Sequence, residues 1–114
     1  MSASFDDVLE LAAQTLEENP ERWTRDVMFR DEWGASTGHP AHACSACALG
    51  MVYLASVELG RDDGSPTNDA GEAERRYHEG SQGWDLGTYN DVYAQSARQV
   101  ADTLRSLKDN DPDA

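Results

Sequence analysis

The sequence has little positive charge, and almost all of it is arginine. Its 114 residues include 9 Lys and Arg against 22 Asp and Glu, a formal net charge of -13, and Lys108 is the single lysine. A surface of this sign repels phosphate backbones and anionic lipid headgroups. The charge therefore argues against direct binding to nucleic acid or to a membrane, and it favours a protein with a basic surface as the partner.

Long apolar runs are also missing. The longest, residues 46–57, is interrupted by Gly50 and Ser56, and it is far shorter than the roughly 20 residues that cross a bilayer. The start of the chain, MSASFDD, contains neither the basic region nor the apolar core of a secretory signal. From these absences we expect a cytoplasmic protein whose two cysteines stay reduced.

Apolar residues spaced three and four apart predict two well-defined helices in the first half of the chain. The first runs from Phe5 to about Glu18, with Ser4 as its N-cap, and ends before Pro20. The second, residues 45–59, is apolar around much of its circumference and is expected to be the most buried. Gly50 inside it weakens the helix, which indicates that a backbone or an aromatic ring packs closely there.

The second half of the chain has one strong helix and several weaker segments. Ser96 followed by Gln99 fits a capping box, so a helix is predicted from there to about Leu107. Residues 61–71 are rich in turn-forming types and predict a loop, and residues 72–79 predict a short exposed helix. Near Val27 the pattern fits a short strand or an extended segment.

These elements predict a mainly α protein: a small single-domain bundle, residues 1–108, followed by a disordered acidic tail, residues 109–114. It would have three main helices, one minor helix, long loops that carry aromatic residues, and one short strand near Val27. A chain of this length is large enough to bury one core.

A zinc site is one candidate for chemistry, because four residues in a nine-residue segment are of zinc-ligating type: His39, His42, Cys44 and Cys47. Structural zinc sites generally join two separated ligand pairs, and this segment has no second pair. The favoured interpretation is therefore that Cys47 is a small buried residue of the second helix and that the histidines lie in a solvated loop. A redox-active cysteine pair is a further alternative, and no other cofactor is predicted.

Two further sets of residues are singled out. The acids proposed for partner binding are Asp31, Glu32, Asp62, Asp63, Glu72 and Glu74, with the alternative that the negative charge serves only solubility. Residues given structural roles are Trp23, Cys47, Gly50, Asn90, Asp91 and Ser96. For Asn90 and Asp91 we favour capping of backbone amides at the turn before the last helix. The alternative is a polar site shared with Trp84 and Tyr89.

Three short motifs resemble a family of small uncharacterised proteins of actinobacteria and their phages. They are Cys47-Ala-Leu-Gly50, Tyr89-Asn-Asp91 and Ser96-x-x-Gln-Val100. Compared with the family pattern, Tyr89 replaces a tryptophan and Met51 replaces an alanine. The resemblance implies a helical fold and an actinobacterial or phage origin, and it implies no reaction.

The leading functional hypothesis is a non-enzymatic, acidic accessory protein, encoded by a phage, that inhibits a host nucleic-acid-binding or defence protein through its basic surface. One alternative is a zinc-stabilised small module, and another is a small helical domain of unknown function without DNA mimicry. A small enzyme that uses the aromatic residues around Trp84 as a pocket is the least supported, because the spacing brings no nucleophile, base and orienting group together.

Overall fold

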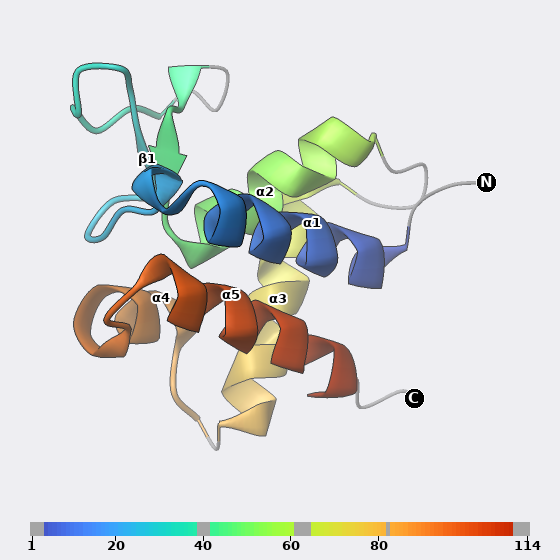
Figure 1. Cartoon of the computed structure of the whole chain (residues 1–114). Helices are drawn as coiled ribbons and strands as arrows, with labels where there is room; N and C mark the ends of the chain where they lie inside the picture. Colours follow the sequence, from blue (N-terminus) through green and yellow to red (C-terminus); the bar gives the residue numbers. More distant parts are fainter. Residues whose placement is uncertain (1–3, 39–41, 61–64, 82, 111–114) are drawn as a thin grey trace.

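Helices dominate the computed structural model, which describes residues 4–38, 42–60, 65–81 and 83–110 (Figure 1). Within these residues there are five α-helices: α1 Phe5–Glu18, α2 Ala48–Leu59, α3 Pro66–Gly80, α4 Leu86–Thr88 and α5 Ala97–Ser106. Strands β1 Phe29–Arg30 and β2 Ser45–Ala46 pair antiparallel. Three short turns complete the list: the 3-10 helices η1 Pro20–Arg22 and η4 Leu107–Asn110, and the π-helix η3 Tyr89–Tyr93. The predicted mainly α fold is confirmed, and none of the described helices has the length and apolar character to cross a membrane.

Helices α1 and α5 begin at the residues that their capping signals predict. The Ser4 hydroxyl accepts from the Asp7 amide and the Asp7 carboxylate accepts from the Ser4 amide, which is a complete capping box. The Ser96 hydroxyl accepts from the Gln99 amide at 3.2 Å, whereas the Gln99 side chain accepts from the Gln95 amide. The last helix therefore has the predicted cap, with the reciprocal bond moved by one residue.

The core lies between α1 and its neighbours. Figure 1 shows α1 and α5 side by side and antiparallel, with α2 and α3 packed behind them. The apolar stripe of α1 is fully buried, as are the facing residues Val100, Ala101 and Leu104 of α5. Because this burial follows the three- and four-residue spacing, the sequence predicts both helices closely.

The β1–β2 hairpin packs on the first turn of α2, which explains Gly50. A Cβ atom at Gly50 would lie 3.1 Å from Cε1 of Phe29 and within clashing distance of the Met28 carbonyl oxygen. That same carbonyl accepts from the Cys47 amide at 3.1 Å. The close approach expected at Gly50 is thus present, and it involves both a backbone and a ring.

Helix α3 begins earlier and is longer than the sequence predicts. We expected a loop over residues 61–71 and a short helix after it, but the helix begins at Pro66, with the Ser65 hydroxyl accepting from the Asn68 amide at 3.1 Å. Serine followed by proline here forms an N-cap and a first helical position rather than a turn. The described part of the chain therefore has four long helices rather than three, and residues 61–64 lie outside it.

Two other boundaries differ from the prediction. The second helix starts at Ala48 because Ser45 and Ala46 are taken up by β2. The short strand expected near Val27 is β1, which lies two residues further on, at Phe29–Arg30. The 3-10 helix η4 continues through Asn110, which is two residues past the predicted end of the domain at residue 108.

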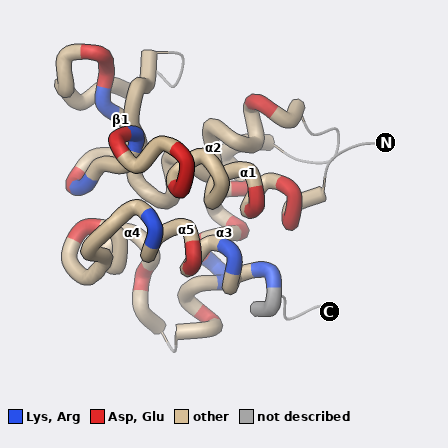
Figure 2. The backbone as a smooth tube through the Cα atoms, viewed as in Figure 1, with Lys and Arg blue, Asp and Glu red and all other residues tan. Residues whose placement is uncertain are grey.

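Most of the basic side chains form hydrogen bonds or ion pairs with other groups of the same chain. Acidic positions are spread over helices and loops alike (Figure 2). Six of the nine basic residues form hydrogen bonds or ion pairs within the chain: Arg25, Arg30, Arg75, Arg76, Arg105 and Lys108. The net charge of -13 follows from the excess of acidic residues alone, because each ion pair neutralises one acid for every base.

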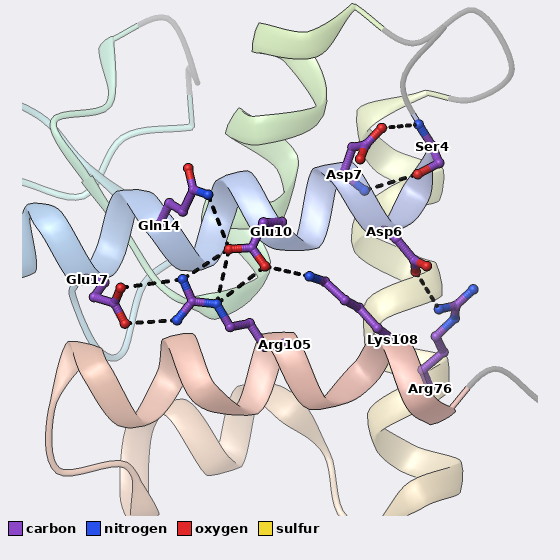
Figure 3. Close-up of polar contacts among 9 residues, drawn as sticks. All are labelled: Ser4, Asp6, Asp7, Glu10, Gln14, Glu17, Arg76, Arg105 and Lys108. Atoms are coloured by element: carbon purple, nitrogen blue, oxygen red, sulfur yellow. Dashed lines mark hydrogen bonds and ion pairs between the residues drawn. The ribbon is translucent and has the colours of Figure 1, made fainter.

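One of these ion-pair clusters joins α1 to α5 and η4 (Figure 3). The Arg105 guanidinium contacts Glu10 at 3.0 Å and Glu17 at 2.8 Å, and Lys108 also pairs with Glu10. Hydrogen bonds from Lys108 and Arg105 lower the pKa of Glu10 to about 2. Glu10 therefore stays ionised in the folded protein at pH values that protonate an ordinary glutamate.

We predict that Gly50→Ala destabilises the protein although alanine is the better helix former. The new methyl group must displace the Met28 carbonyl or the Phe29 ring, which we expect to lower the free energy of unfolding by about 1–3 kcal/mol. Gly71→Ala is the matched control, because Gly71 lies in α3 with no atom within 4 Å of an added Cβ, so it is expected to stabilise by about 0.4–1 kcal/mol. Urea denaturation of both variants measures the difference, and equal stabilisation would contradict the packing described.

We predict that Glu10 makes stability depend on pH in the acid range. Because its pKa is depressed in the folded state, its contribution is present above about pH 4.5 and is lost as the pH falls from there toward about 2. The stability gap between wild type and Glu10→Gln should therefore be widest near pH 7 and should narrow below pH 4.5. The control is Glu18→Gln, at an exposed acid of α1 that makes no ion pair with the described residues. If the difference in free energy of unfolding between wild type and Glu10→Gln stays constant with pH, the prediction is wrong.

Candidate functional site

One buried side chain, that of Asn90, connects three parts of the chain. Its Oδ1 accepts from the Trp23 indole at 2.7 Å and from the Ala48 amide at 3.0 Å, and its Nδ2 donates to the Thr24 carbonyl at 3.0 Å. Asn90 is fully buried. An amide buried this deeply is stabilising when its donors and acceptors are satisfied, and here at least three partners come from distant segments.

The neighbouring Asp91 extends this connection. Its Oδ1 accepts from the Asp26 amide at 2.8 Å and from Asn90 Nδ2 at 2.9 Å. Both side chains thus accept from backbone amides, as predicted, but at the start of α2 and in the segment before β1 rather than at the turn before α5. Neither residue is among those that line the cavity beside Trp84 and Tyr89.

That cavity is aromatic, with a volume of about 230 Å³. The described residues that line it come from α3, from the segment before α4 and from the π-helix: Tyr77, Trp84, Tyr89 and Tyr93. The rings of Tyr77 and Tyr89 have centroids 5.6 Å apart, and those of Trp84 and Tyr93 meet edge to face, also at 5.6 Å. Such pairs are favourable beyond the area that they bury.

Hydrogen bonds fix the wall of the cavity. Glu74 of α3 accepts from the Leu86 amide at 2.7 Å, which ties α4 to α3. Asp85 caps α4 by accepting from the amide of Thr88 at 3.1 Å and from its hydroxyl at 3.0 Å. The Tyr89 hydroxyl accepts from Thr103 of α5 at 2.9 Å. The aromatic rings are therefore held from three helices.

The two carboxyl groups give the cavity a negative surrounding. Burial raises the pKa of Glu74, and the charge of Asp85 raises it further, while the Thr88 hydrogen bonds lower the pKa of Asp85. Burial also raises the pKa of Tyr77, to which Tyr89 and the charges of Glu74 and Asp85 add. Phenol and indole groups with ionised acids nearby are suited to binding rather than to nucleophilic chemistry, because the phenol stays protonated.

The rim of the cavity is exposed and apolar. Trp84 and Tyr93, which both line the cavity, are 54% and 53% exposed. Monomeric proteins seldom leave several large apolar side chains together on the surface, and clusters of this kind mark interaction sites. We call Trp84 and Tyr93 the aromatic face.

A second cavity, of about 340 Å³, brings several predicted site residues together. Its described lining includes Asp31 and Glu32 from the proposed partner set and His42 and Cys44 from the proposed zinc set. Within the described ranges, no three His, Cys, Asp or Glu side chains are grouped so that they could hold a metal ion. His39 lies outside those ranges, so the four-ligand zinc site stays a prediction.

The two cysteines occupy different environments. Cys44 is exposed, whereas Cys47 is buried at the N-cap of α2, where its sulfur accepts from the Gly50 amide at 3.5 Å. Burial raises the pKa of the Cys47 thiol. A thiol held in its neutral form is a poor nucleophile and a poor metal ligand, which supports the structural role favoured for Cys47.

The acids proposed for partner binding are mostly engaged within the chain. Glu72 pairs with Arg75 and Arg76, Glu74 binds the Leu86 amide, and Asp31 accepts from the amides of Trp33 and Ala35. Glu32 is exposed. Asp62 and Asp63 lie outside the described residues. Of the four described acids, two line the second cavity and two lie in α3.

Comparison with known proteins gives a family for the chain. A family model described as a family of unknown function, DUF6197, matches residues 2–110. The chain belongs to the DUF6197 family. Neither the comparison with curated proteins nor that with solved structures gives a match. Membership in DUF6197 therefore brings no activity, ligand or partner with it.

The sequence does not predict the role of Tyr93 or the long-range hydrogen bonds of Asn90. A signal for the aromatic face was present, because residues 77–93 hold four of the nine aromatic residues of the chain. Only the fold shows which of them meet. Asn90 gave no comparable signal, since its partners Trp23 and Ala48 are 67 and 42 residues away.

We predict that Asn90→Ala strongly destabilises the protein. It leaves the Trp23 indole and the Ala48 amide without their acceptor, and each unpaired buried donor costs about 1–3 kcal/mol, so a loss of at least about 2 kcal/mol is expected. Asn68→Ala, at an exposed position of α3, serves as control and should stay within about 0.5 kcal/mol of wild type. Chemical denaturation gives both values, and a similar small change in the two variants would contradict the role assigned to Asn90.

Proposed function

We propose that this chain is a non-enzymatic protein-binding accessory protein that docks a basic partner on its aromatic face. The observation that carries the proposal is the edge-to-face pair of Trp84 and Tyr93, both more than half exposed and adjoining a cavity. Aromatic residues are enriched at the centres of protein interfaces because they bury a large area at little cost in conformational entropy.

The negative charge of the chain indicates that the partner is positively charged. With -13 overall and six of nine basic side chains bonded internally, the protein attracts basic surfaces and repels acidic ones at long range. Acids dispersed over the whole surface steer a partner toward the protein, while the aromatic face supplies the contact. In this arrangement the acidic residues do not have to imitate the regular spacing of the phosphates in DNA.

In its most specific form, the proposal is a phage-encoded protein that acts in the host cytoplasm as an inhibitor of a nucleic-acid-binding or defence protein. Proteins of that class have basic surfaces, and a bound acidic protein would block the access of phosphates to them. This form draws on the net charge and on the resemblance of the three motifs to actinobacterial and phage proteins.

Affinity capture with matched variants tests the proposal. The tagged protein, a Trp84→Ser/Tyr93→Ser double variant and a Trp33→Ser control are incubated with nuclease-treated actinobacterial lysate. Trp33 is 82% exposed and lies in a different part of the chain. We expect wild type and control to retain the same basic protein at low salt and to release it at high salt, and we expect the double variant to retain at least tenfold less.

Two results would contradict the proposal. Retention of the same protein by the double variant would show that the aromatic face is not the docking surface. Retention that does not change with salt would show that charge does not guide the contact, because exposed charges separated by more than about 10 Å are screened at 0.1 M salt.

A further inference from the structure

The aromatic cavity has the composition of a site for a cation. The described residues that line it contribute one indole and three phenol rings. The face of each ring carries a partial negative charge, so that several rings around one space attract a positive group. Three other cavities have mixed linings among the described residues, in which at most two aromatic rings stand beside aliphatic, polar or acidic groups.

Two carboxyl groups that act electrostatically on Tyr77, those of Glu74 and Asp85, add to this attraction. Both are fixed, the first by the Leu86 amide and the second by Thr88. Neither is paired with a basic side chain in the ion pairs between described residues. The Thr88 hydrogen bonds lower the pKa of Asp85, so the negative charge of Asp85 is available to a cation that enters from outside.

The chain already shows which cation it places on aromatic rings. The Arg25 guanidinium carbon lies 4.7 Å from the centroid of the Trp23 ring, and that of Arg76 lies 4.6 Å from the Phe5 ring. A guanidinium is planar and weakly hydrated, so it loses less than an ammonium group when it stacks on a ring. A cavity whose described lining is wholly aromatic favours such a group.

We propose that the cavity lined by Tyr77, Trp84, Tyr89 and Tyr93 receives an arginine side chain of the partner protein. The guanidinium lies against the rings, and Glu74 and Asp85 supply the balancing negative charge. This inference rests on the proposed function and deepens it, because it names the residue of the basic partner that the aromatic face recognises.

A peptide titration tests the inference. The ¹⁵N-labelled full chain is titrated with acetyl-Gly-Arg-Gly-amide, and the indole N–H resonance of Trp84 is followed, with those of Trp23 and Trp33 as internal references. The same peptide with citrulline in place of arginine is the neutral control of equal shape, and peptides with lysine or trimethyllysine test the other cations.

We expect a saturable shift of the Trp84 resonance, with the arginine peptide binding roughly 2- to 30-fold more tightly than the citrulline peptide. Tyr93→Leu, at an exposed position, keeps the Trp84 reporter and should lower the affinity for the arginine peptide to that for citrulline, whereas Trp33→Leu should not change it. Glu74→Gln keeps an oxygen for the Leu86 amide but removes the charge, so it should weaken arginine binding several-fold and leave citrulline binding unchanged.

Equal affinity for arginine and citrulline would overturn the inference, and so would tighter binding of lysine or trimethyllysine. The test separates this inference from the proposed function. If the aromatic-face double variant loses its protein partner but arginine shows no preference over citrulline, the docking surface stands and the arginine assignment fails. If arginine binds selectively while that double variant still captures the partner, the cavity is a cation site and the proposed docking surface is wrong.

Discussion

The fold depends on the hydrogen bonds of one buried amide. Asn90 brings together the Trp23 indole, the Thr24 carbonyl and the first amide of α2. Without it, the segment before β1 and the start of α2 would each bury polar groups without partners, and such groups are far more costly than a lost surface contact. Since Asn90 is also the second residue of the π-helix Tyr89–Tyr93, the same side chain fixes the turn that carries two rings of the aromatic cavity.

The π-helix Tyr89–Tyr93 places one residue, Asn90, in the core and another, Tyr93, on the surface. In the π-helix the Ala94 amide donates to the Tyr89 carbonyl at 2.8 Å, and the wider turn lets Asn90 point inward while Val92 and Tyr93 stay exposed. Single π-helical turns recur at functional sites for this reason. Glu74 ties α4 to α3 through the Leu86 amide, and Asp85 caps α4 through Thr88.

The sequence is most informative where structure is determined locally. Helices α1 and α5 follow from apolar spacing and from the caps at Ser4 and Ser96, and the tight packing at Gly50 follows from the cost of glycine in a helix. The start of α3 was not predicted because serine and proline fit a turn as well as an N-cap. Only burial of Ala70 and Ala73 against the core decides between them.

The candidate site was partly predictable. Clustered aromatic residues around Trp84 pointed to a pocket, but the pairing of Trp84 with Tyr93 and the joint placement of Glu74 and Asp85 depend on how α3 packs, and α3 itself was not predicted in full. The roles of Asn90 and Asp91 depend on partners that are distant in the chain, which periodicity and turn signals do not report.

Native-state hydrogen exchange is the most direct test of the claim that Asn90 organises both the core and the aromatic face. The donors to follow are the Trp23 indole, the Ala48 amide and the Ala94 amide, the last of which closes the π-helix. We predict that all three exchange together, at the rate set by global unfolding, because they belong to one cooperative unit. Exchange of the Ala94 amide much faster than the other two would show that the π-helix opens independently, and it would contradict the dependence of the aromatic face on Asn90.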